Sequence, residues 1–194
     1  LTFGNILHEA MQELYDRDTI RGVKNPQDEI KKLIDKSSVE TAVDKAICKL
    51  LYYSDNSKEE DFSGDTLLVR DIISKYIMGG ILRYDVTRQN FYIKALEDDV
   101  DMCYSISGGR TVNLFGRADR IDELSNGVIQ VIDYKSGNQP HLMYKGVDSL
   151  FNGSSVDRIS NIFQTLLYAM MLHYKYSVDV VPSLYYASKM LSKD

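Results

Sequence analysis

Two stretches near the middle of the chain place carboxylates where they can share a ligand. Ser125-Asn126-Gly127 separates two runs of alternating apolar and polar residues, which predicts a β-hairpin with a three-residue loop. With Asn126 at the centre of the loop, Asp119 and Asp133 each lie seven residues away and face one another across the hairpin. Lys135 follows Asp133 by two residues, so its side chain lies on the same face of the strand.

The repulsion between two carboxylates in this arrangement must be offset by another group. At about 5 Å and an effective dielectric near 20, two like charges repel by roughly 3 kcal/mol. A shared proton, pairing with Arg117 or Arg120, or a bound cation offsets that repulsion. A divalent metal does so best, because carboxylate oxygens are hard ligands that suit Mg²⁺ or Mn²⁺. Lys135 would then orient a water or stabilise charge on a phosphate, which predicts a site for phosphodiester hydrolysis.

The elements that must position these residues follow from the periodicity of the chain. Apolar residues at helical spacing predict helices, and alternation predicts strands. The expected helices are 3–17, 26–36, 38–53, 65–89 and 156–176, with Asn25-Pro26 opening the second and Gly79-Gly80 a weak point in the fourth. The expected strands are 90–96, 102–107, 111–124, 128–134 and 178–187, the last broken by Pro182, with polar loops at 54–64 and 136–155. This order predicts an α/β or α+β fold with a mostly antiparallel sheet flanked by helices.

Composition bounds the class of protein. The chain has 194 residues, of which 44% are hydrophobic and 26% charged, as in a globular domain, which excludes disorder, collagen and coiled coil. No apolar run approaches the ~18 residues that a membrane span needs. Two cysteines without a C-x-x-C motif exclude a disulfide scaffold and suit a reducing compartment, so we expect a cytoplasmic protein. The net charge of −5 argues against a nucleic-acid binder that works alone. Because the chain begins with Leu1, we expect it to be part of a longer protein.

Four motifs in this order resemble those of the PD-(D/E)xK nuclease superfamily, and within it the RecB-like nuclease domains, including the AddB type. They are Phe3-Gly4-x-x-x-His8-Glu9, the run Gly116 to Asp122, the run Ile132 to Gly137, and Gln164-x-x-x-Tyr168. The likeness extends from about residue 3 to about residue 187. It implies a restriction-endonuclease-like core with a mixed sheet built from a β-meander. It also implies one domain over residues 1–194, with a helical insertion at about 26–89.

The resemblance assigns roles residue by residue. It implies that His8, Asp119 and Asp133 bind the metal together with the backbone carbonyl of Tyr134, and that Lys135 is the catalytic lysine. Gln164 and Tyr168 would position the DNA strand or the lysine, and Glu97 would be an additional acid. Mg²⁺ would be the cofactor, with Mn²⁺ able to substitute. An iron–sulfur cluster finds no support within this chain, because Cys48 and Cys103 do not lie where the family has its cluster ligands.

The expected function is therefore metal-dependent hydrolysis of DNA. The resemblance implies an exonuclease acting on single-stranded ends in DNA repair or recombination, fed by a helicase domain or subunit. One alternative is a retired nuclease fold that binds DNA or a protein partner. Another is a hydrolase of other phosphate esters, although the chain has no P-loop. The complete set of His8, Asp119, Asp133 and Lys135 favours the enzyme.

Overall fold

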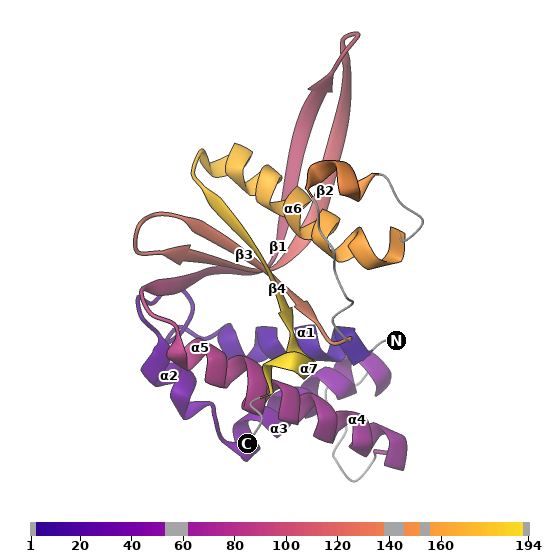
Figure 1. Ribbon diagram of the computed structural model, residues 1–194. Coiled ribbons are helices and arrows are strands. Elements are labelled where there is room, and N and C mark those ends of the chain that lie inside the picture. The colour runs from indigo at the N-terminus through magenta and orange to yellow at the C-terminus, as the bar shows by residue number, and fades with distance from the viewer. Residues whose placement is uncertain (1–2, 53–61, 138–145, 152–155, 192–194) are drawn as a thin grey trace. The chain divides into compact units, whose positions relative to one another are not determined.

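The protein forms two compact units in a computed structural model, shown in Figure 1. The structure describes residues 3–52, 62–137, 146–151 and 156–191, the last range without the side chains of 156–159. The expected loops at 54–64 and 136–155 lie mostly outside these residues. A helical unit comprises residues 1–92, 134–138 and 185–194, and a sheet unit comprises 93–133 and 139–184. Among the described helices, none is long and apolar enough to cross a membrane.

The helical unit packs short helices around an aliphatic core. Its helices are α1 (Phe3–Tyr15), α2 (Gln27–Lys32), α3 (Lys36–Ile47), the π-helix η1 (Cys48–Tyr52), α4 (Gly64–Lys75), the π-helix η3 (Tyr76–Leu82), α5 (Arg83–Thr87) and α7 (Ala187–Met190). Every third or fourth residue of α1 is buried, as the amphipathic pattern of this segment predicted. The Tyr15 hydroxyl donates a hydrogen bond of 2.6 Å to the buried Asp85 carboxylate, which also pairs with Arg88. This network joins α1 to α5.

Two predictions for the helical unit need correction. The helix expected over 26–36 ends at Lys32, because Asp35 caps a new helix by accepting hydrogen bonds from the backbone of Ser37 and Ser38. Asn25 does not cap α2. It adopts a φ of 55°, and its side chain instead accepts a hydrogen bond from the backbone N–H of Asn90.

The weak point predicted at Gly79-Gly80 is present, but the helix does not break there. The segment Tyr76–Leu82 widens into a π-helix between α4 and α5, a rare conformation that occurs mostly as short bulges inside α-helices. A β-carbon at Gly80 would lie 3.2–3.3 Å from atoms of α7. The glycine therefore lets α7 approach the helix closely.

The sheet unit holds four strands in the order β1–β2–β3–β4 and one long helix. The strands are β1 (Phe91–Ile106), β2 (Arg110–Leu124), β3 (Ile129–Lys135) and β4 (Val180–Tyr186); the helices are the short 3₁₀ helix η4 (Val147–Leu150) and α6 (Val156–Tyr176). β2 and β3 are antiparallel. The chain returns through α6 to add β4 beside β3, and Figure 1 shows these two strands running in the same direction, so the sheet is mixed.

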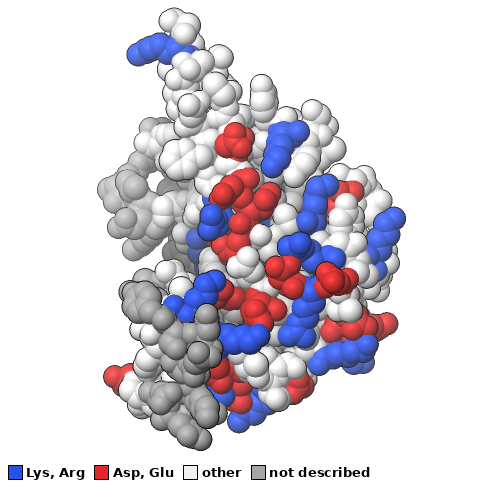
Figure 2. All heavy atoms as spheres, turned by 180° about the vertical axis from the view of Figure 1, so that it is seen from behind, with Lys and Arg blue, Asp and Glu red and all other residues white. Residues whose placement is uncertain are grey.

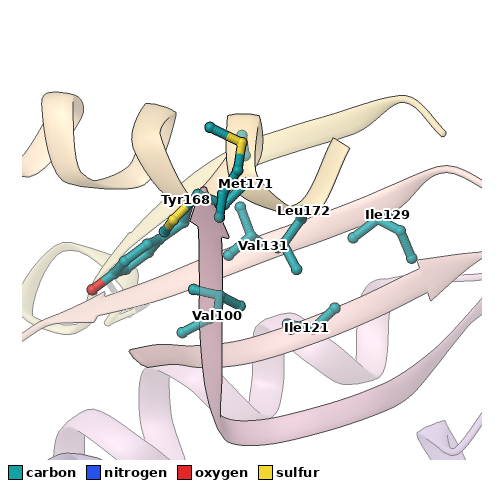
Figure 3. Packing of buried hydrophobic residues seen from close by; sticks show 10 residues of the cluster. Val100, Ile121, Ile129, Val131, Tyr168, Met171 and Leu172 are labelled. Atoms are coloured by element: carbon teal, nitrogen blue, oxygen red, sulfur yellow. The ribbon is translucent and has the colours of Figure 1, made fainter. Parts of the chain in front are cut away.

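Side chains of the strands and of α6 form one apolar core. Figure 3 shows Val100 of β1, Ile121 of β2 and Val131 of β3 gathered with Tyr168 and other side chains of α6. The bounds of α6 are those predicted from the sequence. The two strands expected at 90–96 and 102–107 are instead one strand, β1, with Glu97 in its interior. Pro182 does not break β4, because β4 lies at the edge of the sheet, where a missing N–H is tolerated.

Candidate active site

The pairing of β2 with β3 leads directly up to two acidic residues, Asp119 and Asp133. The paired residues run from Glu123↔Ile129 to Arg120↔Ile132, with every pair in the register predicted from the loop centre. The same register carried one pair further places Asp119 opposite Asp133. Asp119 is 8% exposed and Asp133 is 1% exposed. Two buried carboxylates on neighbouring strands are an arrangement that a purely structural sheet avoids.

A third carboxylate comes from β1. Glu97 has a φ of 46°, a left-handed conformation that non-glycine residues seldom adopt within a strand. A carboxylate oxygen of Glu97 and one of Asp119 lie within 4.8 Å of each other. Three adjacent strands of the sheet unit therefore each supply one acid to this region. Backbone strain of this kind clusters at functional sites, where the surrounding structure holds it in place.

Two arginines close to Asp119 in the sequence form ion pairs with Asp122 and Asp99. Arg120 is fully buried and makes a two-pronged ion pair with Asp122, with N–O distances of 2.7 and 2.8 Å. Arg117 is exposed and bonds to Asp99 at 2.9 Å. The hydrogen bond and charge of Asp99 raise the pKa of Arg117. The pair Arg120–Asp122 was not predicted, although its Arg-x-Asp spacing on a strand puts both side chains on one face.

Within the helical unit, His8 lies against the end of β3. Its Nε2 atom is 3.0 Å from the carbonyl oxygen of Tyr134, and its ring meets the Tyr134 ring edge-on at 6.1 Å. Tyr134 itself is buried, and Lys135 next to it is half-buried. Asp133, Tyr134 and Lys135 are consecutive residues of β3, so the chain itself links this group to the carboxylates of the sheet unit.

On α6, Gln164 and Tyr168 share one helical face and bond to each other. The Gln164 amide donates to the Tyr168 hydroxyl at 2.9 Å. Tyr168 is 7% exposed and belongs to the apolar core, where its ring lies against Gly116 of β2. A β-carbon on Gly116 would be only 2.5 Å from a ring carbon of Tyr168. Two of the four motifs therefore meet directly, because Tyr168 packs on Gly116, which lies three residues before Asp119 on β2.

Comparison with known proteins decides the family. The model of the "PD-(D/E)XK nuclease superfamily" matches residues 1–193, nearly the whole chain. The chain belongs to the PD-(D/E)XK nuclease superfamily. The mixed sheet with α6 packed on it agrees with the restriction-endonuclease-like core of this superfamily, so the predicted fold class is confirmed.

A curated relative supports the same placement. The chain is 32% identical over 146 residues to a subunit of the ATP-dependent helicase/deoxyribonuclease of Clostridium tetani (strain Massachusetts / E88). The match covers 70% of this chain and 12% of the relative. The chain therefore corresponds to a small part of a much longer protein in that bacterium.

The donor atoms of this superfamily member fit a divalent cation. Glu97, Asp119 and Asp133 offer hard carboxylate oxygens, the ligands that Mg²⁺ and Mn²⁺ prefer. In the helical unit, the 3.0 Å between His8 Nε2 and the Tyr134 carbonyl oxygen equals the spacing of neighbouring ligands around an octahedral ion with bonds of about 2.1 Å. Both sets of donors are therefore suited to the same class of ion.

Proposed function

We propose that this chain is the catalytic domain of a divalent-metal-dependent deoxyribonuclease. The observation that carries the proposal is the β2–β3 register, which runs to Arg120↔Ile132 and whose continuation by one pair sets Asp119 opposite the buried Asp133. Glu97 supports it, because a strained acid beside Asp119 adds negative charge that a structural site would not accumulate. A nuclease of this superfamily uses such carboxylates to hold metal.

In this proposal Asp119 and Asp133 hold the ion, and His8 and the Tyr134 carbonyl complete the set of donors. Glu97 is an additional acid at the site. The bound ion supplies Lewis-acid stabilisation of a phosphate and lowers the pKa of water. His8 must then present an unprotonated Nε2, so its hydrogen bond to Tyr134 is replaced on binding.

Lys135 supplies a positive charge to the proposed site. It follows Asp133 by two residues on β3, so its ammonium group is on the same side of the strand as that carboxylate. There it stabilises negative charge that develops on the scissile phosphate, or orients the attacking water. Gln164 and Tyr168 act through the hydrogen bond between them, which fixes the Tyr168 hydroxyl where it can position the DNA strand or Lys135.

The proposal extends to the DNA substrate and to a partner that delivers it. We propose an exonuclease that degrades single-stranded ends, acts in DNA repair or recombination in the cytoplasm, and receives its substrate from a helicase. The relative is named a subunit of a helicase/deoxyribonuclease, which supports that pairing. The net charge of −5 supports it too, since an acidic domain gains from a partner that delivers DNA.

The deciding experiment is cleavage of end-labelled single-stranded DNA with Mn²⁺. The wild type is compared with Asp133→Asn, and Asp101→Asn serves as a matched control because Asp101 is an exposed acid of β1. We expect Asp133→Asn alone to lose cleavage. Equal cleavage by all three proteins would exclude this site. No cleavage and no Mn²⁺ binding by calorimetry would favour the retired module that binds DNA or protein.

A further inference from the structure

The β1–β2 hairpin extends beyond the rest of the sheet. β1 has 16 residues and β2 has 15, whereas β3 has seven. Residues 103–113, which we call the ribbon, are all exposed, and Figure 1 shows the hairpin projecting past α6 and the other strands of the sheet unit. A two-stranded hairpin with neither face covered is only marginally stable in water. The side chains of the ribbon therefore serve something other than the core.

One face of the ribbon continues the apolar face that packs on α6. Val100 and Met102 of β1 are buried in the core cluster. Because side chains alternate along a strand, Tyr104 and Ile106 lie on the same side as these two residues. On β2, Leu114 packs against the cluster, so Val112 and Arg110 share its side. Tyr104, Ile106 and Val112 are 51%, 37% and 40% exposed, respectively.

This face lies on the same side of the sheet as the candidate site. Val131 packs in the α6 cluster, and Asp133 follows it by two residues on β3. Alternation therefore puts Asp133 on the α6 side, together with the apolar face of the ribbon. Tyr104 is seven residues from Glu97 along β1, which corresponds to about 23 Å of strand.

The ribbon and the residues next to it differ in charge from the chain as a whole. Residues 102–118 contain Arg110 and Arg117 but no aspartate or glutamate, in a protein with a net charge of −5. Arg117 is held by Asp99, whereas no carboxylate among the described residues pairs with Arg110. Figure 2 shows the tip of the ribbon in white and blue, without the red that mixes with blue over the rest of that face. This local positive charge suits a polyanion.

We propose that the α6-side face of the ribbon binds single-stranded DNA and leads it toward the carboxylates. Bases stack on Tyr104 and contact Ile106 and Val112, and Arg110 neutralises a phosphate. A duplex fits less well, because its bases hide the faces that an aromatic ring needs. The inference rests on the proposed function, and it assigns the substrate a path outside the catalytic residues.

The test measures binding separately from cleavage. Fluorescence anisotropy with a labelled oligo-dT and EDTA reports the Kd without metal or hydrolysis. We expect Tyr104→Ala to raise the Kd by roughly 5- to 100-fold. Arg110→Ala should reduce the slope of log affinity against log salt by about 0.7, the value of one phosphate contact on a single strand. Unfolding curves check that each variant folds.

Two controls are matched to these variants. Phe115 is an 84% exposed aromatic of the same hairpin but alternates to the opposite face, so Phe115→Ala should bind like the wild type. Arg83 is an exposed arginine of α5, and Arg83→Ala should keep the wild-type salt dependence. Equal Kd values for wild type and Tyr104→Ala, or no binding by the wild type, overturn the proposal. In the first case the apolar face would instead be a surface for another protein.

The outcome is distinguishable from failure of the proposed function. Binding in EDTA does not require catalysis, so loss of affinity in Tyr104→Ala stands even where no protein cleaves DNA. Conversely, cleavage lost only in Asp133→Asn supports the nuclease even where Tyr104→Ala binds normally. If both proposals hold, Tyr104→Ala raises KM for single-stranded DNA while kcat stays near that of the wild type.

Discussion

The ring of Tyr168 on α6 lies so close to Gly116 on β2 that no side chain fits at that glycine. An added β-carbon would meet a ring carbon at 2.5 Å and the hydroxyl oxygen at 3.2 Å. Two motifs whose contacting residues lie 52 positions apart in the sequence (168 − 116) therefore form one packing contact. Since Asp119 is three residues from Gly116, this contact also fixes the strand that carries a proposed metal ligand.

Gly116→Ala should lower stability and cleavage together. Overpacking in a core typically costs about 1–3 kcal/mol, because the Tyr168 ring must move or β2 must shift. Urea unfolding measures the change. The matched test is the double variant with Tyr168→Leu, which removes the ring that the β-carbon meets. The two effects should be less than additive, and strict additivity would contradict the contact.

Asp122→Ala should lower the free energy of unfolding more than any substitution at the candidate site. It leaves the fully buried guanidinium of Arg120 without its two-pronged partner, which typically costs about 3–5 kcal/mol. Asp133→Asn, by contrast, removes a charge from a crowded acidic region and should abolish cleavage with little loss of stability. Chemical denaturation of both variants separates the two roles. A loss under about 1 kcal/mol in Asp122→Ala would contradict the structural role.

The sequence predicted the register of the site because the hairpin loop is local. A three-residue loop with glycine at its end fixes which residues face each other, and the pairs from Arg120 to Glu123 confirm it. The length of α6 followed from its periodicity for the same reason. Local patterns of this kind therefore predict most of the helices and strands of the fold.

Features that depend on tertiary contacts could not be predicted from the sequence. The continuity of β1 through Glu97 depends on a strained φ that no residue pattern announces. Pro182 looked like a break because its tolerance depends on β4 being an edge strand, which only the sheet order reveals. Arg120 was considered from the sequence as a residue that could offset the charge of Asp119 and Asp133, but its full burial in an ion pair with Asp122 was not predicted. The extent of the single domain and of the helical insertion stays a prediction.

Asp35 gives the helical unit a dependence on pH. Hydrogen bonds from the Ser38 hydroxyl and from the backbone N–H groups of Ser38 and Ser37 lower the pKa of this N-cap carboxyl below its usual 3.8. A depressed pKa means that the capping contribution is present above about pH 3.8 and is lost as pH falls through the lower folded-state value. The stability gap between wild type and Asp35→Ala should therefore narrow in this acidic range. Asp35→Asn also caps but does not titrate, so its gap to Asp35→Ala should stay constant with pH.

Mn²⁺ should stabilise the wild type against thermal unfolding. An ion bound only by the folded state at about 100 times its Kd contributes about 2.7 kcal/mol. His8→Ala should lose most of this metal-induced shift, because the proposal makes its Nε2 a ligand. His173→Ala is the matched control, since His173 is an exposed histidine of α6 that bonds to the carbonyl of Val178. An unchanged shift in His8→Ala would remove His8 from the ligand set.

Glu97→Gly should make the metal-free protein more stable and less active. A non-glycine residue at a φ of 46° costs about 1–2 kcal/mol of folding free energy. Glycine avoids this cost, but it loses more conformational entropy on folding, which offsets roughly 0.5–1 kcal/mol of the gain. The net gain of about 1 kcal/mol is increased by removing a carboxylate within 4.8 Å of that of Asp119. Glu97→Gln isolates the charge, since it keeps the strained backbone, so Glu97→Gly should be the more stable of the two in EDTA. Both should cleave DNA more slowly than the wild type. If Glu97→Gly is instead the less stable, then the backbone of β1 at this position is not strained by its side chain.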